Sequence, residues 1–597
     1  MRIRIALAAL LVTSPALAAP LLGPTPPLTA KAAAYERQEI VFSTRENGLF
    51  LDPIVNPPDV PLVQVFFAQT AEPDFAKQTG KQPFAVLAFY DEHGDEGNFA
   101  GIASVGIAAR LMYLRGTGAP AADVARARDA AVRAARAWHV YGTIGGPGVV
   151  ARGVRRIKAE QPGETLPGTI PALVPLKDGS GNPLPTKKEP VWRAPVAPGF
   201  ADWIWFDDTS KDQVSGYALA VTWLWDALHD DPAAPKDLAA LLAADLGLFA
   251  KRLMEITPET GVDLCLRDAD GRLTSFYDLN PRNLGNGPPL PESSTLRTGF
   301  NAAMALGVIR AAYHVTGNED LGRFYYEELV GRRDLPAQMA ANAGLLFIGA
   351  PTNYSNANML AIALATIGRV ETDPYVRQRL DETLTKQFWN TGDSRDASHA
   401  KQAWFDAIYG SYAASPDAGL EARIAANLLG FADAPAIERD RNNCDAQEIS
   451  AGKCLAIDGK TTITLAKEKG WGGTVVADAI VPQSVRPDSD FEWRSDPHRV
   501  NGGPSSRMMP GGDFLAAYWL ARTSDTTTSK NVSPFARPAL PYSPADAGPT
   551  VPPSAVGEGC NCDSTGSAGG GAGVLALVAI AGPILRRMVR VVRRSRA

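Results

Sequence analysis

The segment from Trp203 to Gln213 concentrates polar and aromatic side chains where a helix is predicted to begin. Asp208 and Asp212 are four positions apart, so they share one helix face if the helix already runs between them. Two neighbouring carboxyl groups with separated pKa values can act as acid and base in glycosidic bond cleavage. Lys211 beside them would keep one carboxylate ionised. We therefore take Asp208 and Asp212 as catalytic candidates and Gln213 as a substrate ligand.

Part of this segment also has a simpler explanation. Asp208 or Thr209 can cap the helix, which would account for one or two of the polar residues. Trp203 and Trp205 are candidate sugar platforms, because an indole face matches the apolar face of a pyranose, although large aromatic residues more often belong to a core. The polar and aromatic residues exceed what one helix start needs, and this favours a ligand site.

A second acidic group, residues 91–98, precedes another predicted helix. Carboxylates at a helix N-terminus are favoured by the helix dipole and can cap free N–H groups. Alternatively, His93 and Asp95 form an acid and base pair, or act with Asn98 as cation ligands, since a histidine with carboxylates suits both tasks. His93 and Asp95 are therefore further catalytic candidates.

Arg152 follows a Gly- and Pro-rich turn at residues 145–151 and is a candidate substrate ligand. An arginine in an acidic protein can hold the carboxylate of an acidic sugar with two hydrogen bonds. A salt bridge to a nearby aspartate is the alternative.

Other candidate ligands lie farther along the chain, and one of the asparagines among them is expected to cap a helix. They are Asn353, Tyr354, Asn356, Asn358, Trp404 and Trp493. His399 and His498 are expected to be surface or capping residues.

Several kinds of chemistry are not expected. No phosphate-binding Gly-Lys-Ser/Thr loop, His-Glu-x-x-His helix or Gly-x-Ser-x-Gly elbow occurs in the sequence. Asp268 and Gly271 do not fit a calcium loop, so a turn with Gly271 in a left-handed conformation is expected. The net charge of −5, without a basic stretch before the C-terminal tail, argues against nucleic acid as a partner. No cofactor or metal is predicted.

Cysteine usage points to an oxidising compartment. Cys444 and Cys454 lie close together in a polar segment, and we expect a loop disulfide between them. Cys265, between two leucines, is expected to be a small buried residue.

Hydrophobic periodicity predicts about a dozen helices that would position these residues. Their ranges are 97–116, 121–140, 212–230, 236–255, 299–316, 319–330, 334–347, 356–370, 373–389, 402–413, 417–430 and 511–522. The sequence shows no fixed-period repeat, which argues against a solenoid. Polar clusters precede the helices, as they would where inner helices deliver loops to one end of a cavity. The predicted fold is all-α dominated, an (α/α)6-like toroid at residues 81–525.

The flanking regions differ in composition. Residues 20–80 are predicted to be a Pro-rich extension packed on the main domain, with short strands at 39–43 and 62–67. Residues 461–481 look like a hairpin or loop insertion. Residues 526–556 suit a flexible linker before the tail.

Six segments resemble a group of uncharacterised exported toroid proteins of the polysaccharide-lyase and glycosidase-like class. They are residues 145–152, 208–216, 268–274, 353–358, 493–503 and 510–519. The resemblance implies an α/α toroid and a polysaccharide or glycan ligand, and supports the fold more than the activity.

Both ends of the chain carry targeting features. Residues 1–19 have two arginines, an apolar core and an Ala-x-Ala site, the pattern of a signal peptide. Residues 557–597 contain Cys560 and Cys562, a short apolar run and an arginine cluster. This tail resembles the myxobacterial C-terminal sorting signals, which implies processing or lipidation at Cys560 or Cys562. An ordinary transmembrane anchor is the alternative. In either case we expect a main domain outside the cytoplasm, attached to a membrane through the tail.

Two functions remain open from the sequence. The first is a carbohydrate-active enzyme, a glycoside hydrolase or lyase; an abundance of acids and few placed bases favours hydrolysis. The second is a non-catalytic surface protein that binds a glycan or peptide, or has a structural role in the envelope.

Overall fold

The computed structural model describes residues 20–523 except 70–73, 284–296, 436, 438–441, 488–495 and 503–505. The predicted signal peptide, the linker and the tail with Cys560 and Cys562 lie outside the described residues, and so does Trp493. Within the described ranges, no helix combines the length and the apolar composition that crossing a bilayer requires.

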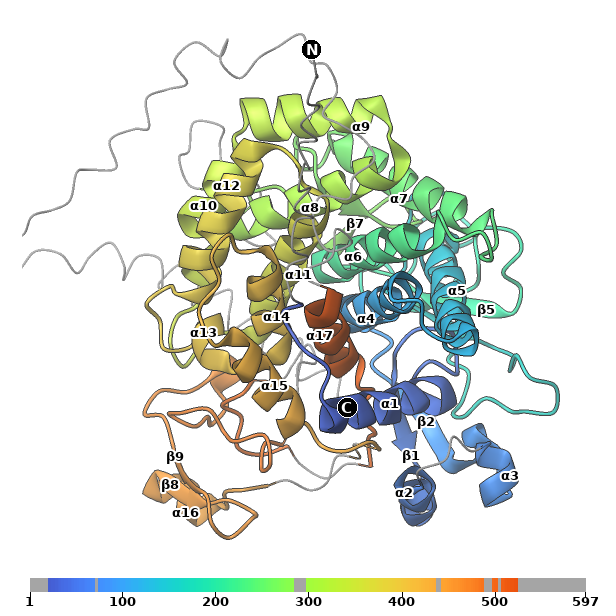
Figure 1. Ribbon diagram of the computed structural model, residues 1–597. Coiled ribbons are helices and arrows are strands. Elements are labelled where there is room, and N and C mark those ends of the chain that lie inside the picture. Colours follow the sequence, from blue (N-terminus) through green and yellow to red (C-terminus); the bar gives the residue numbers. More distant parts are fainter. Residues whose placement is uncertain are drawn as a thin grey trace, which may run out of the picture.

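Six inner helices form a closed ring at the centre of the protein (Figure 1). In chain order they are α4 (Glu96–Gly116), α6 (Lys211–Leu228), α8 (Gly299–Thr316), α11 (Tyr354–Val370), α14 (Ala403–Tyr412) and α17 (Gly512–Thr523). Each helix contacts the next, and α17 contacts α4, so the first and last members close the ring. The chain is helix-dominated, as predicted.

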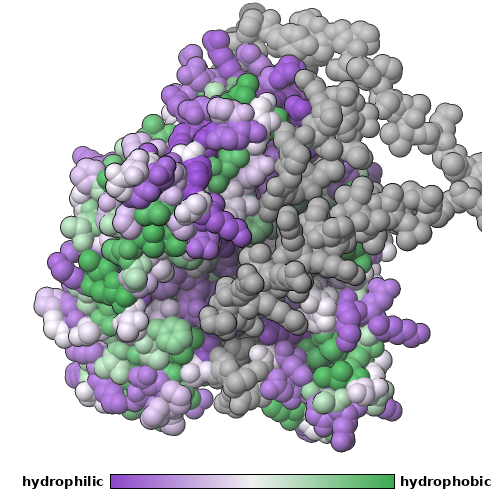
Figure 2. All heavy atoms as spheres, turned by 180° about the vertical axis from the view of Figure 1, so that it is seen from behind, coloured by the Kyte–Doolittle hydropathy of each residue, from purple (hydrophilic) through white to green (hydrophobic). Residues whose placement is uncertain are grey.

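A second layer of helices packs outside the ring. Its members are α5 (Ala121–Thr143), α7 (Leu238–Met254), α9 (Glu319–Arg323), α10 (Leu335–Asn342), α12 (Pro374–Thr383), α15 (Leu420–Gly430) and α1 (Pro26–Gln38). Figure 2 shows the molecule from behind, and its upper part carries mainly hydrophilic residues. Figure 1 places α9 in this upper part. The pairing of inner and outer helices is the arrangement expected of an α/α toroid.

Burial patterns explain the two layers. Every residue of α4 from Glu96 to Leu111 is buried, because other elements surround this helix on all sides. In α5 the buried residues instead follow a stripe at helical spacing, including Ala127, Ala131, Ala134 and Trp138. An outer helix needs only this one apolar face.

The predicted helices agree with the observed ones to within a few residues at most ends. Three of them change geometry near their C-terminal ends. Residues 324–332 and 384–389 form π-helical segments after α9 and α12, and residues 343–346 form a 3-10 turn after α10. The remaining helices are short: α2 (Val60–Ala68), α3 (Phe75–Thr79), α13 (Ala397–Ala400) and α16 (Ala446–Ala451).

The two strands predicted near the N-terminus are wrong. Residues 39–43 continue α1 as a π-helical turn, and residues 62–67 belong to α2. Val63, Phe66 and Phe67 are buried at helical spacing, so packing on one helix face outweighed the β-propensity of this run. Helix α1 packs against α17 and α15 of the toroid.

Small antiparallel sheets precede three of the inner helices. Strand β1 (Asp52–Val55) pairs with β2 (Leu87–Asp91) before α4, and β6 (Cys265–Arg267) pairs with β7 (Leu273–Asp278) before α8. Before α6, β5 (Trp203–Phe206) lies between β3 (Gly153–Arg156) and β4 (Trp192–Arg193). These sheets fix the polypeptide that leads into α4, α6 and α8.

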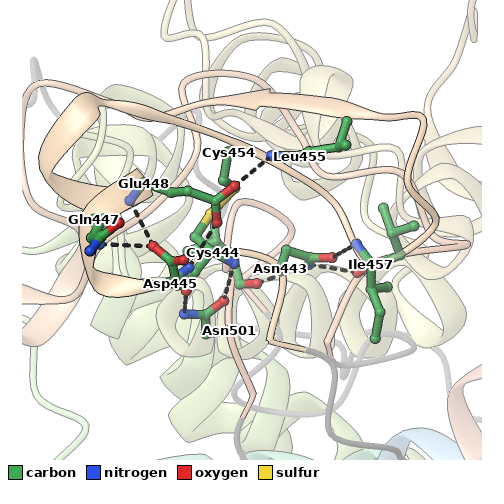
Figure 3. The surroundings of a disulfide bond; sticks show 11 residues. Asn443, Cys444, Asp445, Gln447, Glu448, Cys454, Leu455, Ile457 and Asn501 are labelled. Carbon is green, nitrogen blue, oxygen red and sulfur yellow. Dashed lines mark hydrogen bonds between the residues drawn. A yellow bond between two sulfur atoms is a disulfide. The ribbon is translucent and has the colours of Figure 1, made fainter.

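The insertion after α15 has its own small core and contains the predicted disulfide (Figure 3). Cys444 and Cys454 are joined, with their sulfur atoms 2.01 Å apart. Cys454 lies in β8 (Lys453–Leu455), which pairs with β9 (Thr462–Thr464). Within residues 461–481, where a hairpin or loop insertion was predicted, Leu465 and Ala477 form an antiparallel bridge, and β9 also pairs with β8, which precedes this range. Cys265 is free and buried, as predicted.

Candidate active site at the N-terminal end of the ring

The inner helices run in the same direction, so their N-termini meet at one end of the ring. The backbone N–H of Asn98 in the first turn of α4 donates to Gln213 Oε1 of α6 at 3.1 Å. Lys211 Nζ at the start of α6 lies 3.3 Å from Asn301 Oδ1 at the start of α8. These contacts bring the loops before α4, α6 and α8 together.

Two buried carboxylates meet at this end, Asp95 at the N-cap of α4 and Asp212 in the first turn of α6. Gln213 Nε2 lies 3.2 Å from Asp212 Oδ2 and 3.5 Å from Asp95 Oδ1, so one amide nitrogen reaches both groups. Arg152 Nη2 lies 3.7 Å from Asp95 Oδ1, and Arg152 Nη1 donates to the Asp208 carbonyl at 3.2 Å. The structure thus gathers Asp95, Arg152, Asp212 and Gln213, four residues that the sequence singled out.

The surroundings of Asp212 favour its protonated form. Burial raises the pKa of the Asp212 carboxyl, and the neighbouring Asp95 raises it further, while Arg152 and the hydroxyl of Ser210 act to lower it. The result is a pKa above the ordinary aspartate value. In this pair Asp212 is therefore suited to hold and donate a proton.

Asp208 does not pair with Asp212 in the way that the sequence predicted. Helix α6 begins at Lys211, after Asp208, whose backbone has a φ of 61°. Its carboxylate accepts a hydrogen bond from the Ser275 N–H at 2.7 Å, and its own N–H donates to Asp268 Oδ2 at 2.7 Å. Asp208 thus ties the loop before α6 to β7, and Ser210 occupies the N-cap position expected of Asp208 or Thr209.

Lys211 also has different partners from those expected. Its Nζ lies 3.6 Å from Asp278 Oδ1 and 5.5 Å from the centre of the Phe300 ring. The ammonium group therefore supports the contact between α6, β7 and α8. The expected role of keeping Asp208 or Asp212 ionised is not seen.

The two tryptophans proposed as sugar platforms belong to the core. Trp203 and Trp205 share one face of β5 and are 9% and 0% exposed. Trp205 Nε1 donates to the Ala194 carbonyl at 2.9 Å, and the Arg156 guanidinium covers the Trp203 ring at 4.5 Å. Strand β5 lies between two other strands, and Ile204 on its opposite face is also buried, so both indoles are packed inside the protein.

The aromatic residues near the site are instead Phe206 and Trp192. They are paired across β5 and β4, only partly buried, and their ring centres lie 5.1 Å apart. A Cβ atom built on Gly94, next to Asp95, would lie 3.5 Å from Phe206 and 3.7 Å from Arg152, which places Phe206 beside the Asp95 loop. No local signal in β5 separates Phe206 from Ile204, which lies on the same face of the strand and is buried.

His93 pairs with Glu46 and not with Asp95. Its Nε2 lies 3.1 Å from Glu46 Oε2, and the other oxygen of Glu46 accepts from Arg155 Nε at 3.0 Å. Burial acts to lower the pKa of His93, but Glu46 and Glu96 outweigh it and raise the pKa. The structure therefore gives His93 a carboxylate partner, Glu46, that the sequence analysis missed.

Glu96 is a second residue that the sequence analysis missed. It is fully buried, accepts hydrogen bonds from the Val154 N–H at 2.8 Å and from Asn47 Nδ2, and has a pKa raised by burial to about 7. Asn98, in the first turn of the same helix, is buried with both side-chain polar atoms unpaired within the described residues. Only neighbours distant in sequence distinguish Glu96 from an ordinary helix-start residue, whereas the sequence had already suggested Asn98 as a cation ligand.

The candidates at α11 are partly structural. Asn353 caps the helix by accepting from the Ser355 N–H at 3.0 Å, which confirms the predicted asparagine cap. The Tyr354 hydroxyl donates to the Arg395 carbonyl at 3.0 Å, and its ring lies 6.4 Å from that of His498. His498, expected to be a surface or capping residue, is only 2% exposed, and its Nδ1 lies 3.2 Å from the Ala477 carbonyl oxygen.

Three further candidates differ in accessibility. Asn356 is partly exposed, whereas Asn358 and Trp404 are each 1% exposed and closed off from a ligand in this conformation. Asp268 and Gly271 form the predicted turn, with Gly271 at a φ of 87°. In the part of the chain that the structure covers, His, Cys, Asp and Glu side chains form no group of three that could hold a metal ion.

Comparison with known proteins adds little to this geometry. No protein family model matches the sequence, and no curated protein matches it. An endoglucanase from the termite Nasutitermes takasagoensis superposes with a TM-score of 0.36 and 10% identity over 84% of this chain and 99% of that chain. The cellulase Cel9M of C. cellulolyticum gives a TM-score of 0.35 and 11% identity over 83% of this chain and 98% of that chain. At these TM-scores neither enzyme is a basis for assigning an activity.

Proposed function

We propose that the N-terminal end of the ring is the active site of a glycoside hydrolase that acts on a polysaccharide. The observation that carries the proposal is the buried pair Asp95 and Asp212, held within reach of one amide nitrogen of Gln213. Hydrolysis of a glycosidic bond requires two such carboxyl groups, one protonated and one ionised. The pair therefore has the composition that this reaction needs.

The two carboxyl groups have different assigned roles. Asp212, whose pKa is raised by burial and by Asp95, donates its proton to the glycosidic oxygen as the bond to the leaving sugar breaks. Asp95, which lies 3.7 Å from the Arg152 guanidinium, acts as the second carboxyl group of the pair. It either removes a proton from the attacking water or attacks the sugar carbon itself, depending on the distance between the carboxyl groups with substrate bound.

Aromatic side chains support binding of a sugar. Phe206 and Trp192 lie beside the Asp95 loop, and Phe276 is 39% exposed where β7 bridges to Ser210, two residues before Asp212. Exposed rings present flat apolar faces that can stack on a pyranose. Aromatic residues therefore lie in the segments next to both carboxyl groups, Phe206 and Trp192 near Asp95 and Phe276 near Asp212.

Arg152 favours hydrolysis over elimination. A lyase needs a cation free to neutralise the carboxylate of a uronic acid. Here the Arg152 guanidinium already contacts Asp95 and the Asp208 carbonyl. We therefore propose a polysaccharide substrate without a requirement for uronic acid.

The proposal also includes the location of the protein. The signal-like residues 1–19 and the tail at 557–597 support export and attachment to the cell surface. A polysaccharide outside the cell would then be accessible to the toroid.

The experiment is a screen of soluble polysaccharides with protein lacking the first 19 and the last 40 residues. We expect release of reducing ends, and a loss of about 10²- to 10⁴-fold in kcat for Asp212→Asn and for Asp95→Asn. Asp123→Asn on the outer helix α5, where Asp123 pairs with Arg126 on the surface, is the control and should retain full activity. Binding of a glycan without any turnover would instead favour a non-catalytic binding protein.

A further inference from the structure

Asp208 has an unusual backbone conformation in the loop that leads from β5 into α6. The residue is 1% exposed, and its φ of 61° is a left-handed value that residues other than glycine rarely adopt. Aspartate and asparagine tolerate this conformation better than most residues, but it persists only where neighbouring groups hold it. The contacts around Asp208 must therefore fix the loop.

Two neighbouring segments hold Asp208. Its carboxylate accepts a hydrogen bond from the Ser275 N–H of β7, and its own N–H donates to Asp268 Oδ2, both at 2.7 Å. The same Asp268 oxygen lies 2.6 Å from Lys188 Nζ, while Asp268 Oδ1 accepts from the Ala269 N–H at 2.7 Å. Asp268 is 2% exposed, so its carboxylate is a buried acceptor that joins the loop before α6 to the segment between β3 and β4.

The conformation of this loop brings one carbonyl group to the candidate active site. The Asp208 carbonyl oxygen accepts a hydrogen bond from Arg152 Nη1 at 3.2 Å, and Arg152 Nη2 lies 3.7 Å from Asp95 Oδ1. The backbone of Arg152 is fixed as well, because its N–H donates to the Phe206 carbonyl at 2.8 Å. One nitrogen of the guanidinium is thus bound by Asp208 while the other reaches Asp95.

We propose that Asp208 is a positioning residue, whose carbonyl oxygen holds the Arg152 guanidinium beside Asp95. This inference rests on the proposed glycosidase activity, in which Asp95 and Asp212 are the carboxyl pair. Asp208 itself exchanges no proton with the substrate, and its carboxylate keeps the loop in place through Ser275. Asparagine can accept the same hydrogen bond and tolerates the same backbone conformation, so the negative charge of Asp208 is not required.

The first test compares Asp208→Asn with Asp208→Ala in the full chain, on a polysaccharide that the wild type hydrolyses. We expect Asp208→Asn to retain most of the wild-type kcat. Asp208→Ala loses the bond to Ser275 and disfavours the left-handed backbone, so we expect a loss of about 10²-fold, as for a misplacement of about 1 Å. A proton-transferring Asp208 would instead make Asp208→Asn as inactive as Asp212→Asn, and the proposal would then be wrong.

A double-mutant cycle separates positioning from a general loss of structure. If Asp208 acts through Arg152, then Asp208→Ala should cause little further loss of kcat in a protein that already carries Arg152→Ala. Unfolding temperatures establish that each variant is folded. Losses that multiply in the double variant would show that Asp208 acts by another route, contrary to the proposal.

The second test needs no turnover, so it also applies if the proposed activity is absent. Phenylglyoxal modifies accessible arginine side chains, and mass spectrometry of peptides measures the modification of each one. The Arg152 side chain is 16% exposed, and its modification should become faster in Asp208→Ala. Asp268→Asn should have the same effect, because asparagine has one side-chain oxygen where Asp268 uses two.

Asp268→Asn also keeps the size of the side chain, so it tests the proposal even if Asp208→Ala does not fold. Arg126 on α5, whose side chain is 52% exposed, is the internal control and should react equally in all variants. An unchanged rate at Arg152 in the folded variants would overturn the positioning role. A wild type that hydrolyses no polysaccharide but shows the faster reaction at Arg152 in the variants would refute only the proposed function.

Discussion

At the scale of single residues, the role of each carboxylate at the N-terminal end of the ring depends on its hydrogen-bond partners and on the charges beside it. Asp208 accepts a backbone hydrogen bond and fixes a loop, whereas Asp212 is buried beside Asp95 and has a raised pKa. Glu96, the first residue of α4, is fully buried and has a pKa of about 7. The same functional group thus has a structural role, a proposed catalytic role and a role in pH-dependent stability.

Glu96 should make stability depend on pH. Its pKa is about 7 in the folded protein and 4.5 as an ordinary glutamate, so the ionised form is less favourable in the folded state. Its contribution is fully present below pH 4.5 and is lost as pH rises to about 7. Glutamine does not titrate, so the free energy of unfolding of the wild type, relative to Glu96→Gln, should fall by about 3 kcal/mol over this range.

Urea unfolding of both proteins at pH 4.5, 6 and 8 measures this difference. Subtracting the variant removes the contributions of other titrating groups that do not contact Glu96. A difference that stays constant between pH 4.5 and 8 would show that Glu96 has the same pKa in the folded and unfolded states.

The sequence identified most residues of the candidate site but paired them incorrectly. Asp95, Arg152, Asp212 and Gln213 were all candidates, yet Asp212 was paired with its neighbour Asp208 and not with Asp95. Gln213 and Asp95 are 118 positions apart, and only the packing of α4 on α6 brings them together. Local spacing cannot reveal such a contact. The burial of Trp205, which excludes it as a sugar platform, likewise depends on neighbours that are distant in sequence.

At the scale of elements, close packing of α4 on α6 sets the distance between the two proposed catalytic carboxylates. A Cβ atom on Gly216 of α6 would lie 2.0 Å from the Gly97 carbonyl oxygen, and one on Gly101 would lie 2.5 Å from the Gly216 carbonyl oxygen. These are backbone atoms, which cannot move aside as a flexible side chain can. Glycines at this crossing therefore let the two helices approach closely.

Gly216→Ala should destabilise the protein by about 3 kcal/mol or more, because the new methyl group overlaps a backbone carbonyl at the crossing. Gly116→Ala is the matched control, since Gly116 is the exposed last residue of α4 and a Cβ atom there meets nothing within 4 Å. Chemical unfolding of both variants measures the change. Equal stabilities would mean that α4 and α6 can separate without cost.

Helices were predicted well because their signal is local. Apolar residues at helical spacing and the residues that end each helix lie within the helix itself, as in α8, whose predicted and observed bounds coincide. Helices α1 and α2 were missed because prolines and β-branched or aromatic residues obscure the pattern. Their conformation depends on the helices against which they pack.

At the scale of the whole molecule, the ring depends on the last described helix. Helix α17 contacts both α4 and α14, and all of its residues from Gly512 to Thr523 are buried. Helix α1, from the other end of the described chain, packs on its outer side. The two ends of the described chain therefore complete the same part of the toroid.

A protein containing residues 20–523 should fold, whereas one containing residues 20–510 should not. The shorter protein lacks Phe514, Leu515, Tyr518, Trp519 and Leu520, all 7% exposed or less. Burial of each large apolar side chain contributes about 1.5–3 kcal/mol, so their loss approaches the whole stability of about 5–15 kcal/mol that domains have. Circular dichroism during heating and resistance to protease would compare the two proteins. A cooperative transition in the shorter protein would show that the ring can close without α17, and that α4 and α14 can cover each other.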